Sequence, residues 1–275
     1  MRIEITSDPV EFQARAGAFL DRDPLRHSVL CTILDNEISG LTIPEQPSFF
    51  ASAHENEVVG VAMRTAGRGV WLGDLPEPAV PELVARFSEL LPEIDDVHGD
   101  ASAAAEFARV WSERHTTSYR AGRVERLYRL GALRTPTAPG GPRQATLADL
   151  ELCARWNAAM AAELEGVPLA LDDAGLRGRL GAGRWWLWED GGRPVSLTAH
   201  QAAVRGWSRI GPVYTPPETR GRGYASALVA HVSGRLRTAG LDVCLYTDLG
   251  NPTSNKIYRA IGFEEVFDQV QYVFA

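Results

Sequence analysis

The chain has few of the features that mark secreted, membrane-spanning or metal-binding proteins. Its three cysteines, Cys31, Cys153 and Cys244, are odd in number and far apart, which predicts buried thiols instead of a disulfide framework or a zinc site. No run of about 18 uncharged apolar residues occurs, and the first residues contain no apolar signal segment. We therefore expect a cytoplasmic protein with no membrane partner and no bound metal.

Positive charge is also scarce. The net charge is -7, and Lys256 is the only lysine among 28 basic residues. A general nucleic-acid binder needs a basic surface, so we expect no nucleic-acid partner.

A segment rich in proline and glycine divides the sequence into two halves of similar length. Residues 134–143 contain three prolines and two glycines, which exclude a helix and a central strand. The 275 residues are 45% apolar, enough for each half to bury a core. We predict a first domain over residues 1–133, a linker over 134–142 and a second domain over 143–275.

Both halves predict the same order of elements, a three-strand meander followed by helix, strand, helix and strand. The second half begins with an additional helix, and its elements are expected at 147–165, 185–188, 194–203, 207–214, 224–239, 241–247, 251–261 and 263–274. The corresponding elements of the first half are expected at 49–54, 58–65, 70–72, 81–91, 94–98, 101–115 and 124–130. We therefore predict two copies of one α/β fold.

The loop before the helix at 224 has the composition of an anion site. Arg220, Gly221, Arg222 and Gly223 combine two positive charges with two glycines, which let backbone N–H groups converge at a helix start. The Walker phosphate loop is excluded because no Gly-Lys-Ser/Thr follows. The dinucleotide motif fits poorly, since its third glycine is missing and prolines separate the strand from the turn. The sequence therefore predicts a site for phosphate or diphosphate. A plain surface loop that leads into a helix is the alternative.

Two segments of the second half resemble the signatures of the GNAT (Gcn5-related N-acetyltransferase) superfamily. Residues 213–225, VYTPPETRGRGYA, resemble the segment that binds the diphosphate of acyl-CoA. Residues 251–263, NPTSNKIYRAIGF, resemble the second signature, Asn-x-x-Ala/Ser-x-x-Leu/Ile-Tyr-x-x-x-Gly-Phe. The resemblance covers residues 143–275, whereas residues 1–133 match only in element order. In that half, residues 73–80 carry acids and prolines in place of the arginines and glycines.

The resemblance implies two tandem GNAT folds of mixed α/β architecture, each with a splayed central sheet flanked by helices, the first copy being degenerate. It implies that acetyl-CoA is a cosubstrate and that Tyr258 protonates the departing thiolate. Asn251 also has the sequence context of a helix cap. The residues implied to bind the cofactor are Val213, Tyr214, Thr215, Arg220, Gly221, Arg222, Gly223, Tyr224, Ala225, Ser226, Asn251, Asn255 and Tyr258.

The resemblance implies transfer of an acetyl group to a primary amine, and a small-molecule amine is favoured over a protein side chain. The strand before the site, Ser208-Arg209-Ile210, lacks the glutamate that some family members keep as a base. Glu163, Glu165 and His200 are the candidate substitutes, and Arg209 is a candidate for binding an acidic group of the acceptor. Two alternatives stay open, a non-catalytic acyl-CoA sensor and a mycothiol-synthase-like acetylation of a cysteinyl amine. The sequence leaves the oligomeric state open, monomer or homodimer.

Overall fold

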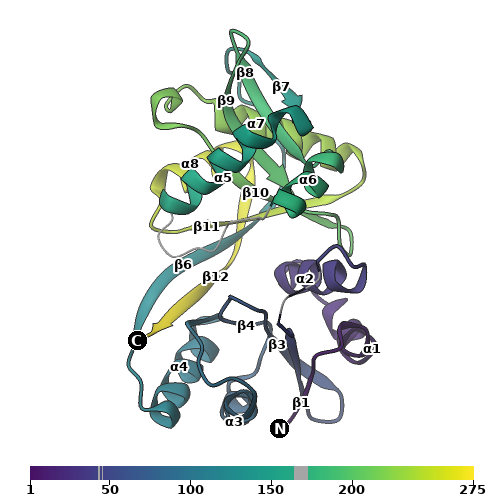
Figure 1. The fold of residues 1–275 in the computed structure, drawn as a ribbon, viewed down its shortest axis with the longest axis vertical. Coiled ribbons are helices and arrows are strands. Elements are labelled where there is room, and N and C mark those ends of the chain that lie inside the picture. Colours follow the sequence, from purple (N-terminus) through teal and green to yellow (C-terminus); the bar gives the residue numbers. More distant parts are fainter. Residues whose placement is uncertain (43, 45, 164–172) are drawn as a thin grey trace. The chain divides into compact units, whose positions relative to one another are not determined.

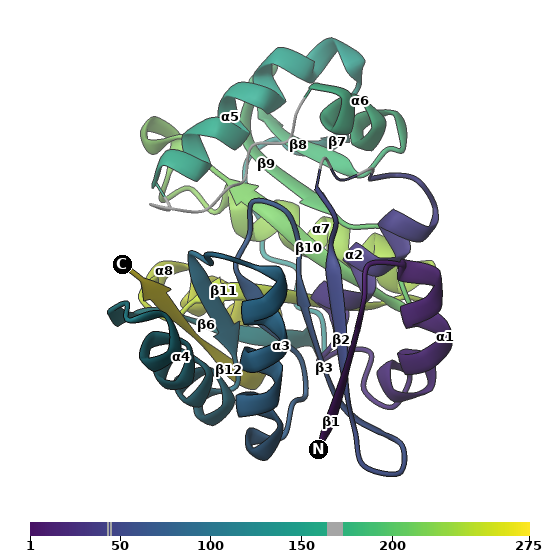
Figure 2. The same cartoon turned by 60° about the horizontal axis from the view of Figure 1, so that its bottom comes forward.

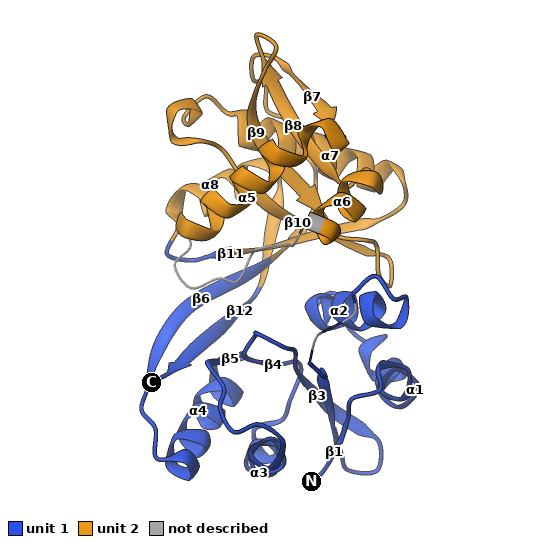
Figure 3. Cartoon of the chain, in the orientation of Figure 1, with its two compact units in different colours: residues 1–127, 248–250, 267–275 blue, residues 128–247, 251–266 orange. Residues whose placement is uncertain are grey.

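The chain forms two compact units in the computed structural model, which describes residues 1–42, 44, 46–163 and 173–275 (Figure 3). Unit 1 contains residues 1–127, 248–250 and 267–275, and unit 2 contains residues 128–247 and 251–266. Helices and strands are numbered in their order along the chain, and Figure 1 labels most of them.

Unit 1 has helices on both faces of a mixed sheet. Its strands follow the order β1-β2-β3-β4-β5-β12-β6, and β4 and β5 pair in parallel. Its helices are α1 (Pro9–Leu20), α2 (Ser28–Ile38), α3 (Val80–Leu90) and α4 (Ala101–His115). Its strands are β1 (Arg2–Thr6), β2 (Phe49–His54), β3 (Val58–Arg64), β4 (Val70–Leu72), β5 (Asp96–Gly99), most of β6 (Tyr119–Leu130) and the second half of β12 (Phe263–Phe274).

The core of unit 1 lies mainly under α3 and α4, which lie side by side (Figure 2). Phe87 of α3 and Phe107 of α4 are fully buried there. Helix α1 packs on the other face, where Phe12 stacks on Phe50 of β2 with ring centroids 5.2 Å apart. Neighbouring side chains of a strand point to opposite faces. Phe50 of β2 therefore contacts α1, whereas its neighbour Ala51 lies in the core under α3 and α4.

Unit 2 repeats this architecture. Its strands follow the order β11-β10-β9-β8-β7, and β10 and β11 are the parallel pair. Its helices are α5 (Leu150–Glu163), α6 (Asp173–Gly181), α7 (Tyr224–Thr238) and α8 (Pro252–Ile261). Its strands are β7 (Gly141–Gln144), β8 (Trp185–Asp190), β9 (Arg193–His200), β10 (Trp207–Tyr214) and β11 (Asp242–Asp248).

The tryptophans of β8 divide between the two faces of this sheet. Trp185 lies in the core under α5 and α6, whereas Trp186 and Trp188 lie in the core under α7 and α8. All three are buried. They fill the two cores, as strand alternation predicts, and do not line one common pocket.

The units differ from the predicted domain boundaries at both ends of unit 2. Residues 128–130 of β6 belong to unit 2, and residues 267–275, with most of β12, belong to unit 1. In unit 1 the last strand pairs with β5, for example Gln271 with His98. A fragment cut at residue 133 would therefore lack part of its own sheet.

The predicted linker is part of unit 2. Gly141 and Pro142, its last two residues, lie in β7, which pairs with β8 alone. An edge strand tolerates proline because one side of it needs no hydrogen-bond donor. Before it, the carbonyl of Pro139 accepts a hydrogen bond of 2.7 Å from Nε1 of Trp188. The proline-rich segment is thus held against the second core by specific contacts.

Candidate functional site

The parallel strands β10 and β11 of unit 2 pair over a short stretch and then part. Their register joins Trp207 to Asp242 and ends with Arg209 opposite Cys244. On its other side β10 stays paired with β9 as far as Tyr214, across an irregularity between Ile210 and Val213. The strand edge around Val213 therefore faces a gap beside β11, the splay that the resemblance implies.

The glycine loop follows β10 at the open end of this gap. A 3-10 turn over Pro217–Thr219 leads into it, and α7 begins at Tyr224. Gly221 and Gly223 have φ of 79° and 82°, a region that residues with a Cβ rarely adopt. A Cβ on Gly221 would meet nothing within 4 Å. The glycines are therefore required by the backbone conformation, and the space around Gly221 is open to a ligand.

The N–H groups of this loop are available to an anion. The helix has no side-chain cap, and its first bond to the loop runs from Ala227 N to Gly223 O at 3.0 Å. Among the described residues, no acceptor faces the N–H groups of Gly221 through Ser226. Free N–H groups at a helix start, with the positive end of the helix dipole, form a site for phosphate groups.

The side chain of Arg220 is engaged beside this loop. Its Nη2 donates hydrogen bonds of 2.7 and 2.8 Å to both carboxylate oxygens of Glu163, the last residue of α5, and its Nε donates to Thr215 O at 2.8 Å. Glu163 and burial both raise the pKa of Tyr214, with burial the larger effect. Of the candidate bases, Glu163 is thus an ion-pair partner of the loop, and Glu165 lies outside the described residues.

Tyr224 contributes its backbone to the loop, because its side chain points into the core. The ring is 2% exposed, and its hydroxyl donates a hydrogen bond to Asp190 at the end of β8. Ala225 and Ser226 follow it in the first turn of α7. Arg222 is exposed on the loop itself.

The two asparagines of the second signature hold the start of α8. Oδ1 of Asn251 caps the helix by accepting a 3.0 Å hydrogen bond from Ser254 N. Nδ2 of Asn255 donates to Asn251 O at 2.8 Å, and its Oδ1 accepts from the hydroxyl of Tyr128 at 3.0 Å. Tyr128 lies on β6, and no sequence signal connects it with α8. These amides therefore have partners within the protein.

Removal of the Tyr128 hydroxyl should cost stability. In Tyr128→Phe, Oδ1 of Asn255 loses that donor in a place that water does not reach, since both residues are buried. We expect the free energy of unfolding to fall by about 1–3 kcal/mol. Urea denaturation monitored by circular dichroism measures it, and an unchanged midpoint would show that the bond contributes nothing.

Tyr258 lies one turn after Asn255 on α8 and is 8% exposed. Its ring approaches Tyr128 and Phe263, with centroids 6.5 and 6.0 Å away. Among the described residues its hydroxyl has no hydrogen-bond partner. Burial raises the pKa of Tyr258 to about 12. The phenol therefore carries its proton at neutral pH and is able to donate it.

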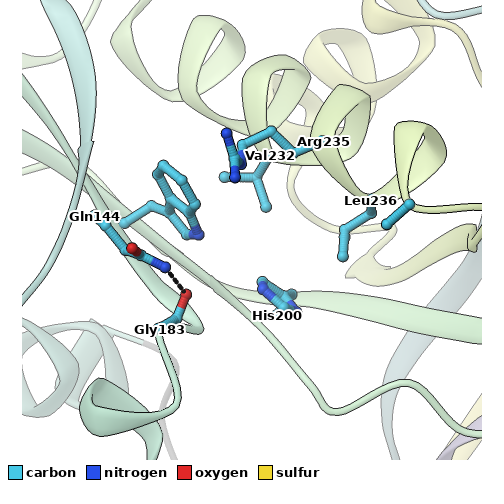
Figure 4. A pocket seen from close by; sticks show the side chains of 8 residues that line it. Gln144, Gly183, His200, Val232, Arg235 and Leu236 are labelled. Atoms are coloured by element: carbon cyan, nitrogen blue, oxygen red, sulfur yellow. Dashed lines mark hydrogen bonds between the residues drawn. The ribbon is translucent and has the colours of Figure 1, made fainter.

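His200 lies at a second place, a cavity of about 190 Å³ beneath the C-terminal half of α7 (Figure 4). Its Nδ1 lies 3.0 Å from Gln201 O, and burial lowers the pKa of the ring. The cavity borders Leu236 and Ala239, about 20 Å along the helix from Tyr224 at 1.5 Å per residue. His200 is thus remote from the glycine loop.

The corresponding loop of unit 1 has two N–H groups occupied at its start. Gly73 N donates to Val61 O at 2.9 Å, and Asp74 N donates to Nε2 of His27 at 3.2 Å. Burial lowers the pKa of His27, which keeps Nε2 free to accept. Arg26 pairs with Asp74 at 3.3 Å. The start of this loop therefore binds its own unit through these two N–H groups.

Among the described residues, no group of three His, Cys, Asp or Glu side chains is arranged to hold a metal ion. No helix in the same part of the chain combines the length and the apolar character needed to cross a membrane.

Comparison with known proteins identifies the fold. Residues 191–273 match the family model described as FR47-like protein, and no curated protein sequence matches the chain. A GNAT acetyltransferase from Colwellia psychrerythraea is 11% identical, with coverage of 100% of this chain and 99% of that one and a TM-score of 0.65. A GCN5-related N-acetyltransferase from Sphaerobacter thermophilus is 18% identical, with coverage of 98% and 94% and a TM-score of 0.63.

A tandem GNAT protein from the clavulanic acid biosynthesis pathway is 11% identical, with coverage of 100% of this chain and 98% of that one and a TM-score of 0.56. At these identities the likeness concerns the fold. The chain therefore has the fold of the GNAT acetyltransferases, and residues 191–273 match the FR47-like family model.

Proposed function

We propose that this protein is an N-acetyltransferase that moves the acetyl group of acetyl-CoA to a primary amine, the amine belonging to a small molecule. The observation that carries the proposal is the set of free N–H groups at residues 221–226, which stands at the open end of the gap between β10 and β11. A diphosphate held there would direct its attached arm along Val213 to Thr215. In the corresponding loop of unit 1, the N–H groups of Gly73 and Asp74 are already occupied.

The chain's own residues supply two functions for this reaction. Residues 220–226 would hold the diphosphate, and the unpaired edge of β10 would offer backbone groups to the arm. The amine nitrogen attacks the thioester carbonyl, the carbon–sulfur bond breaks, and the thiolate takes the phenolic proton of Tyr258. The nitrogen gives up one proton as the amide forms, and a proton from solvent restores the phenol. The attacking nitrogen must be neutral, so its extra proton leaves to a base or to water before the attack.

Calorimetry and a thiol assay test the proposal together. We expect heat of binding when acetyl-CoA is added to the full chain, and release of free thiol when a panel of primary amines is supplied. Absence of heat would overturn the assignment of the donor site. Heat without thiol release across the panel would instead support the sensor alternative.

The ion pair of Glu163 favours the sensor alternative, in which the protein binds acyl-CoA without turning it over. The carboxylate faces Arg220 of the loop, with both oxygens within 2.8 Å of Nη2. A base for the amine must lie near the thioester, not beside the diphosphate. A role of Glu163 as proton acceptor stays a prediction. The ion pair predicts a different role, that of a charge partner of Arg220.

Glu163→Gln separates the two roles. As a charge partner, Glu163 repels the diphosphate and competes for Arg220, so we expect the variant to bind acetyl-CoA about 2- to 5-fold more tightly at low salt, with kcat changed less than 3-fold. The side chains of the pair are 47% and 46% exposed, which keeps the effect small. A fall in kcat of about 100-fold at unchanged affinity would instead identify Glu163 as the base. Glu151→Gln, on the exposed start of α5, is the control.

A further inference from the structure

Arg209 of β10 is half-buried, and one nitrogen of its guanidinium has no partner. Its Nη1 is shielded from solvent and makes no hydrogen bond. Among the described residues no carboxylate lies within ion-pair distance of its guanidinium. An arginine side chain remains charged in proteins. A buried hydrogen-bond donor of a charged group costs free energy when it has no acceptor. The unbonded Nη1 of Arg209 therefore requires an explanation.

The position of Arg209 connects it with the proposed acetyl transfer. It is the last residue of β10 that pairs with β11, so it marks the closed end of the gap. The glycine loop lies at the opposite end of the same strand segment. A donor whose diphosphate is held at residues 220–226 and whose arm enters the gap would present its thioester toward this closed end.

The face of the sheet on which Arg209 lies follows from its neighbours. Ile210 belongs to the core under α7, and so do Val243 and Leu245 of β11. Strand alternation places Arg209 and its partner Cys244 on the opposite face, the one that α5 and α6 cover elsewhere in unit 2. The charge therefore does not point into the cavity that His200 borders.

We propose that Arg209 binds an oxyanion of the acceptor, a carboxylate or a phosphate, so that the acceptors are acidic amines such as amino acids. This inference rests on the proposed acetyl transfer, in which the acceptor is the amine that receives the acetyl group. The guanidinium presents paired N–H donors that match both oxyanions, and an anion bound there would supply the partner that Nη1 lacks.

Matched pairs of amines test this directly on the full chain. Glycine is compared with glycinamide, and phenylalanine with phenylalaninamide. O-phosphoethanolamine is compared with ethanolamine, which separates phosphate from carboxylate. Affinity is measured by calorimetry with and without saturating CoA, so the result does not depend on turnover. Where thiol is released, kcat/KM is corrected for the fraction of neutral amine, because the amides have the lower amine pKa.

We expect the wild type to favour the acidic member of at least one pair by 10- to 100-fold, the range for hydrogen bonds to charged groups. Arg209→Gln should remove that preference, Arg209→Lys should keep part of it, and both should bind acetyl-CoA normally. Arg193→Gln, on an exposed position of β9, is the matched control and should retain the preference.

Two results would overturn the inference. One is equal affinity of the wild type for both members of every pair. The other is an acid preference that survives in Arg209→Gln. Failure of the proposed function looks different, because acetyl-CoA then gives no heat or no thiol is released, while the acidic amine still discriminates wild type from Arg209→Gln in the binding assay. If Arg209→Gln does not fold, two measurements still test the inference. They are the affinity of the wild type for the two members of each amine pair and the same comparison in Arg209→Lys.

Discussion

Gly223→Val should abolish measurable binding of acetyl-CoA to the full chain. Gly223 has φ of 82° immediately before α7, and a β-branched residue strongly disfavours this conformation. The variant must either pay about 1–2 kcal/mol of strain or turn the peptide, which moves the N–H groups that hold the anion. Calorimetry measures the loss, which we expect to exceed 100-fold in Kd.

Gly240→Val is the matched control for this substitution. Gly240 has φ of 79° and open space around the position of a Cβ, but it follows the C-terminal end of α7, away from the loop. We expect a similar loss of stability with unchanged affinity for acetyl-CoA. Wild-type affinity in Gly223→Val, or an equal loss of affinity in both variants, would contradict the anion site.

Tyr258→Phe should lower kcat by about 100-fold or more while the Kd for acetyl-CoA changes less than 3-fold. The reason is that the phenol donates its proton only as the carbon–sulfur bond breaks, a contribution typical of general acids. The ring remains packed against Phe263, so binding and folding persist. Steady-state thiol release measures kcat, and calorimetry measures the Kd for acetyl-CoA. Equal kcat in both proteins would remove the acid role.

The pH profile provides an independent check on Tyr258. Burial raises its pKa to about 12, so the protonated form that the reaction needs persists as the pH rises from 7 to 10. We expect no alkaline fall in wild-type kcat over this range. A fall with a pKa near 10 would show that the phenol is not buried as described. Tyr128→Phe, which removes a neighbouring hydroxyl, should lose stability but keep kcat.

The glycine loop and the elements around it could be predicted from the sequence because their conformation depends on neighbouring residues. Gly221 and Gly223 adopt positive φ, and α7 begins directly after them. Gly262 ends α8 with φ of 108°, as its place after the helical pattern predicts. In unit 1, β2 begins and ends at the predicted residues 49 and 54. Helices and turns of this kind are encoded within a few positions of the chain.

The partners of the charged and polar groups could not be predicted in the same way. Arg220 meets Glu163 across 57 positions, and Tyr128 meets Asn255 across 127. Neither pair leaves a periodic or spacing signal, since each depends on how separate elements pack. For the same reason the unpaired state of Arg209 Nη1 emerges only once every neighbouring element has been placed.

The sequence by itself determined where the glycine loop lies and which half of the chain carries it, because glycines, arginines and a helix start act locally. Only the tertiary structure decided that unit 1 takes residues 267–275 into its sheet and that its own loop is closed by His27. Strand pairing and buried hydrogen bonds join distant parts of the chain, and their free energy depends on the complete set of neighbours.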